Sequence, residues 1–119
     1  MAAQLAPTLA RWFTPAALAE NGWAVEYAHR CVLRANVADW AATWRALADV
    51  DTIDRLGEIA VPTRVIAGER DPSTPPELMR EIADRIPGAS FHVVAGGPHM
   101  LSLERPAELA LVIAGQRGG

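Results

Sequence analysis

Two short apolar runs joined by an amphipathic segment constrain the fold of this chain more than any other feature. Residues 63–68 (TRVIAG) and 89–94 (ASFHVV) have the length and composition of buried parallel strands. Between them, Thr74-Pro75-Pro76-Glu77 predicts a capping box and a helix whose apolar stripe is Leu78, Met79, Ile82, Ala83 and Ile86. Two strands joined by a helix predict a βαβ unit with parallel strands and a right-handed crossover.

A single βαβ unit does not make a complete parallel sheet. Parallel sheets are buried on both faces and are usually wider than two strands. The strand at 63–68 would also leave one edge without a hydrogen-bonding partner. A last helix, opened by Pro106, adds one more covering element. We therefore expect an α/β fold in which residues 58–119 form a βαβα unit at the end of a larger sheet.

The first part of the chain, residues 1–57, has a helical pattern and is rich in alanine and tryptophan. Thr14 and Asn36 are suitable N-cap residues, and Asn21-Gly22 is a good helix end. The expected helices run from Pro15 to Asn21, from Trp23 to Ala35, onward from Asn36, and from Asp51 to Gly57. We expect the single cysteine, Cys31, to be buried, and the four tryptophans (Trp12, Trp23, Trp40 and Trp44) to belong to the core.

Composition and charge exclude several classes of function. The 11 basic and 14 acidic residues give a net charge of −3, which provides no electrostatic footprint for nucleic acid or anionic lipid. No uncharged stretch of about 20 residues is present, so no membrane span is expected. The N-terminal segment lacks the pattern of a secretory signal. A chain with one cysteine fits the reducing cytoplasm.

An acid and a histidine follow the two expected strands. Asp71 lies in the loop after residues 63–68, and His99 lies in the loop after residues 89–94. The carboxyl ends of parallel strands meet at one sheet edge, where sites gather in open α/β sheets. A carboxylate at that edge can accept the imidazole N–H and so fix the tautomer for proton transfer. A structural turn aspartate and a plain loop histidine are the alternatives.

The same segments resemble the α/β-hydrolase family. VPTRVIAGERDPSTPP is similar to the family segment that carries the catalytic acid, and GGPHMLSLERP is similar to the block of the catalytic histidine. The resemblance assigns the acid to Asp71 and the base to His99, with Glu104 and Pro106 in the E-x-P pattern that follows. It implies the C-terminal part of the fold, with residues 1–57 as a helical lid and 58–119 as the end of the core. Within the family, RWFTP and IAGERDPSTPP are most similar to the 3-oxoadipate enol-lactonases.

The sequence departs from this family at the nucleophile. A G-x-S-x-G turn is absent, and Ser73, Ser90 and Ser102 do not lie between glycines on a strand-to-helix turn. Cys31 is a poor substitute. The chain is therefore expected to be the lid and the acid–base half of an ester or lactone hydrolase, inactive alone, with a missing N-terminal half as partner. The alternative is a non-catalytic binding or dimerisation module that self-associates through the exposed strand edge.

Substrate contacts are expected from the helical part. Trp12 and Trp40 are candidates for the pocket wall, and Arg34 is a candidate cation for a carboxylate-bearing ester or lactone. Arg11, Arg30 and Arg45 are further cation candidates, although exposed arginines are usually solvated. His29 and His92 are expected to have structural roles. The three histidines lack metal-ligand spacing, so we expect no metal and no cofactor.

Overall fold

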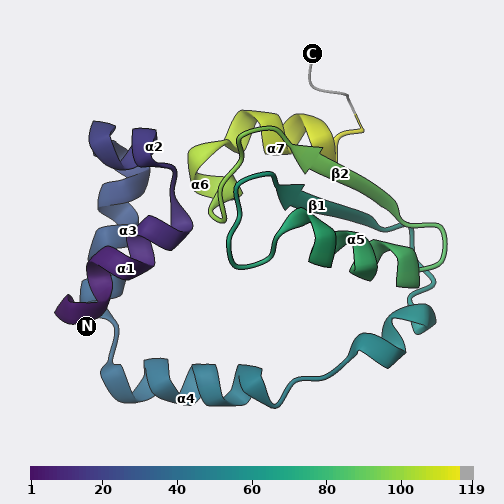
Figure 1. Ribbon diagram of the computed structural model, residues 1–119, viewed down its shortest axis with the longest axis horizontal. Helices are drawn as coiled ribbons and strands as arrows, with labels where there is room; N and C mark the ends of the chain where they lie inside the picture. Colours follow the sequence, from purple (N-terminus) through teal and green to yellow (C-terminus); the bar gives the residue numbers. More distant parts are fainter. Residues whose placement is uncertain (116–119) are drawn as a thin grey trace.

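The two expected strands pair in the computed structural model, which describes residues 1–115 (Figure 1). Strand β1 (Arg64–Gly68) and strand β2 (Ser90–Val94) are parallel, with Arg64 opposite Ser90 and Gly68 opposite Val94. Within the described residues the sheet has two strands. The last four residues of the part expected at 58–119 lie outside the described residues. The fold class is α/β, as predicted.

Helices cover both faces of this sheet. Helix α5 (Pro76–Arg85) packs on one face and helix α7 (Pro106–Ile113) on the other, with the short helix α6 (Leu101–Glu104) before it (Figure 1). Under α5, Val65 packs with Ala83 and Ile86 in one buried cluster. The alternation of side chains along a strand explains this layering, because successive residues point to opposite faces.

The first part of the chain is helical, as expected. Its elements are α1 (Ala2–Trp12), α2 (Pro15–Glu20), α3 (Trp23–Arg34), α4 (Val37–Ala48) and the 3₁₀ helix η1 (Ile53–Glu58). The predicted caps are confirmed: the Thr14 side chain accepts from Ala17 N, and Asn36 accepts from two amides of α4. Asn21 ends α2 in the left-handed conformation, with φ of 47°. Helices α1 and α6 have no separate counterpart among the helices expected from the sequence.

Three expectations about individual side chains are wrong. Cys31 is exposed. Helix α3 buries Val25, Ala28 and Val32 along one face, and Cys31, which directly precedes Val32, lies off that face. Trp23 and Trp44 are 67% and 55% exposed, so these two tryptophans are not core residues. The expected capping box is absent from α5. Its N-cap is Pro75, and the Thr74 hydroxyl donates to a carboxylate instead of capping the helix.

Helix α4 and the sheet edges leave apolar and backbone groups uncovered. None of residues 37–48, all of which are described, is buried, and Val37, Trp44 and Leu47 are more than half exposed. Within residues 1–115, β1 and β2 pair only with each other, so each strand has one open edge. None of the helices in the described part is long and apolar enough to cross a membrane.

Candidate active site

The loops that follow the two strands bring Asp71 and His99 together. The Nδ1 atom of His99 lies 2.9 Å from Oδ2 of Asp71. The Asp71 side chain is 7% exposed, whereas that of His99 is 30% exposed. In the described part of the chain, the second ring nitrogen of His99, Nε2, makes no hydrogen bond. This arrangement holds the imidazole by its inner nitrogen and leaves the outer nitrogen available to a reacting group.

The Asp71 carboxylate is surrounded by hydrogen-bond donors. Its Oδ1 accepts from the backbone N–H groups of Ser73 at 2.8 Å and Thr74 at 3.1 Å. Its Oδ2 accepts from the Thr74 hydroxyl at 2.6 Å and faces His99. Burial raises the pKa of this carboxyl, but the hydrogen bonds, led by the Thr74 hydroxyl and His99, outweigh burial and lower the pKa below its usual value. Asp71 is therefore ionised and acts as an acceptor for the imidazole.

Backbone contacts fix the two loops against each other. A Cβ added to Gly68 would lie 2.5 Å from the carbonyl oxygen of Gly97, so only glycine fits this position. Arg70 N donates to that same Gly97 oxygen at 2.8 Å. The Glu69 carboxylate accepts from the N–H of Gly96, which has a φ of 64°. These contacts set the distance between the residues that carry the acid and the histidine.

The helices of residues 1–57 reach the histidine loop from the other side. Met100 N, directly after His99, donates to the carbonyl oxygen of Trp12 at 2.9 Å. The Glu104 carboxylate accepts from Thr14 twice, from the backbone N–H at 2.9 Å and from the hydroxyl at 2.6 Å. The loop of His99 is therefore held by contacts on both sides.

The other candidate residues lie at different distances from this pair. Trp12 is next to the histidine loop through its backbone, and its ring packs against Trp40 with centroids 6.5 Å apart. Trp40 in turn packs against Trp44 at 6.4 Å. Arg34 is exposed at the end of α3, and within residues 1–115 it forms no ion pair or side-chain hydrogen bond. The structure therefore brings Trp12 toward the loop of His99 and does not bring Arg34 into contact with it.

The three serines, all in the described part of the chain, do not hydrogen-bond to His99. Ser73 donates its backbone N–H to Asp71, and its side chain is exposed. The Ser90 hydroxyl accepts from Arg64 at the start of the strands, and Ser102 is exposed on α6. The site therefore pairs a carboxylate with an imidazole, and none of these serines hydrogen-bonds to that imidazole.

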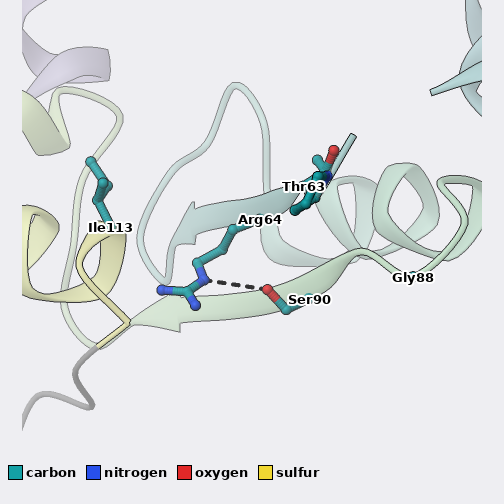
Figure 2. A pocket seen from close by; sticks show the side chains of 6 residues that line it. Thr63, Arg64, Gly88, Ser90 and Ile113 are labelled. Atoms are coloured by element: carbon teal, nitrogen blue, oxygen red, sulfur yellow. Dashed lines mark hydrogen bonds between the residues drawn. The ribbon is translucent and has the colours of Figure 1, made fainter. Parts of the chain in front are cut away.

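A groove of about 330 Å³ lies at the other end of the strands (Figure 2). Figure 2 shows the hydrogen bond that Arg64 Nε donates to the Ser90 hydroxyl. This bond is 3.3 Å long, and the Arg64 guanidinium also donates to the carbonyl of Val112. Arg64 is thus committed to structural contacts. Sites in open α/β sheets lie at the carboxyl ends of the strands, so this groove is on the opposite edge. Within residues 1–115, no cluster of three or more His, Cys, Asp or Glu side chains could hold a metal ion.

Sequence reasoning missed three residues of the site. Glu69 was not singled out, Thr74 was assigned to a helix cap, and Thr14 was assigned to a cap alone. The positions of Thr74 and Glu69, three residues after Asp71 and two residues before it, are the only sequence signal that could have indicated them. A polar residue so close to a turn aspartate is common, so this signal is weak.

The chain is an α/β protein, since its parallel sheet has helices on both faces. Its candidate site lies at the carboxyl edge of the sheet, where a carboxylate and an imidazole pair beyond the strand ends. The chain belongs to the alpha/beta hydrolase family, whose model matches residues 1–111. It is 30% identical to 3-oxoadipate enol-lactonase 2 of Acinetobacter baylyi over 104 residues, which are 87% of this chain and 38% of that protein.

Two solved structures share the fold. The enol-lactonase from Burkholderia xenovorans LB400 superposes with a TM-score of 0.91 at 23% identity, over 97% of this chain and 44% of that chain. A hydrolase from Pseudomonas aeruginosa PA01 superposes with a TM-score of 0.82 at 30% identity, over 97% and 44% of the two chains. This chain therefore spans less than half the length of the relatives it matches.

Proposed function

We propose that this chain supplies the acid and base of a serine-type ester or lactone hydrolase. The observation that carries the proposal is the 2.9 Å contact between Asp71 and the inner nitrogen of His99. In this proposal, residues 58–119 are the end of the hydrolase core. Residues 1–57 are the lid, and they contact the histidine loop through Trp12 and Thr14.

The proposed reaction follows from this geometry. A serine outside these 119 residues attacks the carbonyl carbon of the substrate, and His99 Nε2 takes the serine proton. His99 then returns a proton to the leaving oxygen. A water molecule, activated by the same imidazole, releases the acid product. Asp71 stays ionised throughout, holds the Nδ1–H tautomer and stabilises the imidazolium that forms. No cofactor takes part in this chemistry.

The substrate is proposed to be an ester or lactone that carries a carboxylate. The similarity to 3-oxoadipate enol-lactonase 2 of Acinetobacter baylyi supports the lactone. Trp12 and Trp40, whose rings pack together, would form part of the pocket wall. Arg34 would serve as the cation for the carboxylate, if the complete enzyme brings the end of α3 toward the pocket.

The partner is proposed to be the nucleophile-bearing part of a hydrolase. The open edge of β1 offers unpaired backbone groups to a further parallel strand, and α4 presents exposed apolar side chains to cover. Alone, the chain would not hydrolyse esters, because none of its serines is partnered by His99. A single cysteine, which has no partner for a disulfide within the chain, supports a cytoplasmic location.

The test is p-nitrophenyl acetate hydrolysis by two proteins. One is the 119-residue chain. The other is a chimera that joins this chain to the portion of the Acinetobacter baylyi enol-lactonase that this chain does not match. Cooperative unfolding of the chimera is the check that it folds. We expect activity from the chimera alone, its loss in His99→Ala, and its retention in the matched control His92→Ala on β2. A folded chimera that stays inactive, or one that is insensitive to His99→Ala, would overturn the proposal.

A second candidate function is a non-catalytic binding module. The observation that favours it is the open edge of β1, which can pair with a second copy of the chain. Sedimentation equilibrium distinguishes this candidate from the first. A defined dimer that persists when the nucleophile-bearing portion is added would favour the binding module. A dimer that dissociates when this portion is added would favour the hydrolase.

A further inference from the structure

A buried glutamate outside the acid–base pair joins the two parts of the chain. The Glu104 side chain is 10% exposed, and Thr14, which it binds, is 6% exposed. A carboxylate is seldom this buried, and its burial is tolerated only when hydrogen bonds compensate for the lost water. Here one oxygen accepts from the Thr14 N–H at 2.9 Å and the other from the Thr14 hydroxyl at 2.6 Å. Both oxygens therefore bind Thr14, and Oε1 also lies 3.9 Å from Nε of Arg105, the next residue.

This contact lies close to His99 on the polypeptide. Glu104 is in α6, which begins two residues after His99. In the described part of the chain, three hydrogen bonds join distant segments of 1–57 and 58–115: the two to Thr14 and that from Met100 N to the Trp12 carbonyl. All three connect residues 12–14 with residues 100–104. The polar connection between the two parts is thus concentrated at the segment that follows the histidine.

Apolar packing reinforces the same contact. Met100 and Leu103 pack against the buried cluster that contains Leu9 and Phe13. On the other side, a Cβ added to Gly97 would lie 2.5 Å from the Leu101 side chain. The histidine loop therefore has little free space on either side, and a shift of α6 would be transmitted to the ring of His99.

We propose that Glu104 is a positioning residue: by binding both donors of Thr14, it fixes α6 and so holds the His99 ring with Nδ1 toward Asp71. This inference rests on the proposed function, since it assigns a role in the same site. It also accounts for two sequence features that the acid–base pair does not explain. These are the RWFTP segment, which contributes Thr14, and the E-x-P pattern, which contributes Glu104.

The test measures which ring nitrogen of His99 carries the proton. The ¹⁵N chemical shifts of the imidazole distinguish the Nδ1–H from the Nε2–H tautomer, and they are recorded on the 119-residue chain above the range in which a free imidazole titrates. Glu104→Met keeps the length of the side chain but removes both acceptor oxygens, so it can bind neither donor of Thr14. We expect the Nδ1–H tautomer to lose its dominance in Glu104→Met and in Thr14→Val, and to be retained in Thr14→Ser.

The matched control is Asn36→Ala, which removes the N-cap of α4 without touching residues 97–104. Thr14→Val also removes a cap, so Asn36→Ala separates a lost cap from a lost contact with Glu104. Urea unfolding of each variant shows whether a changed tautomer comes from a shift of the His99 ring or from loss of the folded state. Folded Glu104→Met and Thr14→Val chains that keep the wild-type tautomer would overturn the positioning role. A wild-type chain that carries Nε2–H would instead contradict the acid–base pair itself, so the two failures are distinguishable.

Discussion

Replacing Thr74 with valine removes one hydroxyl and leaves the shape of the side chain nearly unchanged. That hydroxyl donates to Oδ2 of Asp71 at 2.6 Å, the same oxygen that faces His99. Asp71 is 7% exposed, so water cannot replace the lost donor without a shift of the loop. The substitution therefore tests whether the site stabilises an ionised carboxylate.

The magnitude follows from the charge on the acceptor. A hydrogen bond to a charged group contributes about 1.5–3 kcal/mol, so we expect Thr74→Val to lower the free energy of unfolding by about 2 kcal/mol near neutral pH. This bond favours the ionised form and lowers the pKa of Asp71 in the folded chain. Its contribution is present above the ordinary aspartate pKa of about 3.9 and is lost as pH falls through the lower pKa of the folded state. The difference between wild type and variant should therefore shrink in acid.

The assay is urea unfolding of both proteins at neutral pH and across the acid range. Thr74→Ser should restore the stability, since serine keeps the hydroxyl. Thr43→Val is the matched control, because the Thr43 hydroxyl donates to a backbone carbonyl on exposed α4 and its loss should cost under about 0.5 kcal/mol at every pH. An equal loss of stability at neutral and acid pH, or no loss at all, would refute the ionised, hydrogen-bonded state of Asp71.

Two further predictions concern the loops and the thiol. Gly68→Ala should lower the free energy of unfolding in urea by about 1–3 kcal/mol, because its Cβ would meet the Gly97 carbonyl at 2.5 Å. The control Gly57→Ala should change it by under about 0.5 kcal/mol, because the nearest atom to its Cβ is 4.0 Å away. Equal effects of the two changes would contradict the close approach of the loops. Exposed Cys31 should react with a thiol reagent in the folded chain at the rate seen in urea, and protection in the folded chain would show that α3 is placed wrongly.

The βαβ unit could be predicted from the sequence because its signals are local. The apolar runs before Asp71 and His99 and the proline at the start of α5 specify the elements, and the rule for parallel strands places both loops at one edge. The parallel pairing and the contact between the two residues follow from these elements.

The remaining contacts depend on tertiary packing, which periodicity does not encode. The capping interpretation of Thr74 was reasonable locally, but a buried carboxylate is a better acceptor for its hydroxyl than a helix that begins with proline. Thr14 and Glu104 are 90 residues apart, and neither carries a sequence signal for the other. Trp44 has the spacing of a core residue, yet it is exposed because the described part of the chain has no surface to cover it.

The most direct test of the acid–base pair is the coupling between its two members. In the folded chimera, p-nitrophenyl acetate hydrolysis is measured for Asp71→Asn, His99→Ala and the double variant. Because the two residues would act as one unit, Asp71→Asn should lower kcat by roughly 10⁴-fold and His99→Ala by roughly 10⁶-fold, and the double variant should lose no more than His99→Ala alone. Losses that multiply, or an Asp71→Asn variant with unchanged kcat, would contradict the pairing of Asp71 and His99 as acid and base.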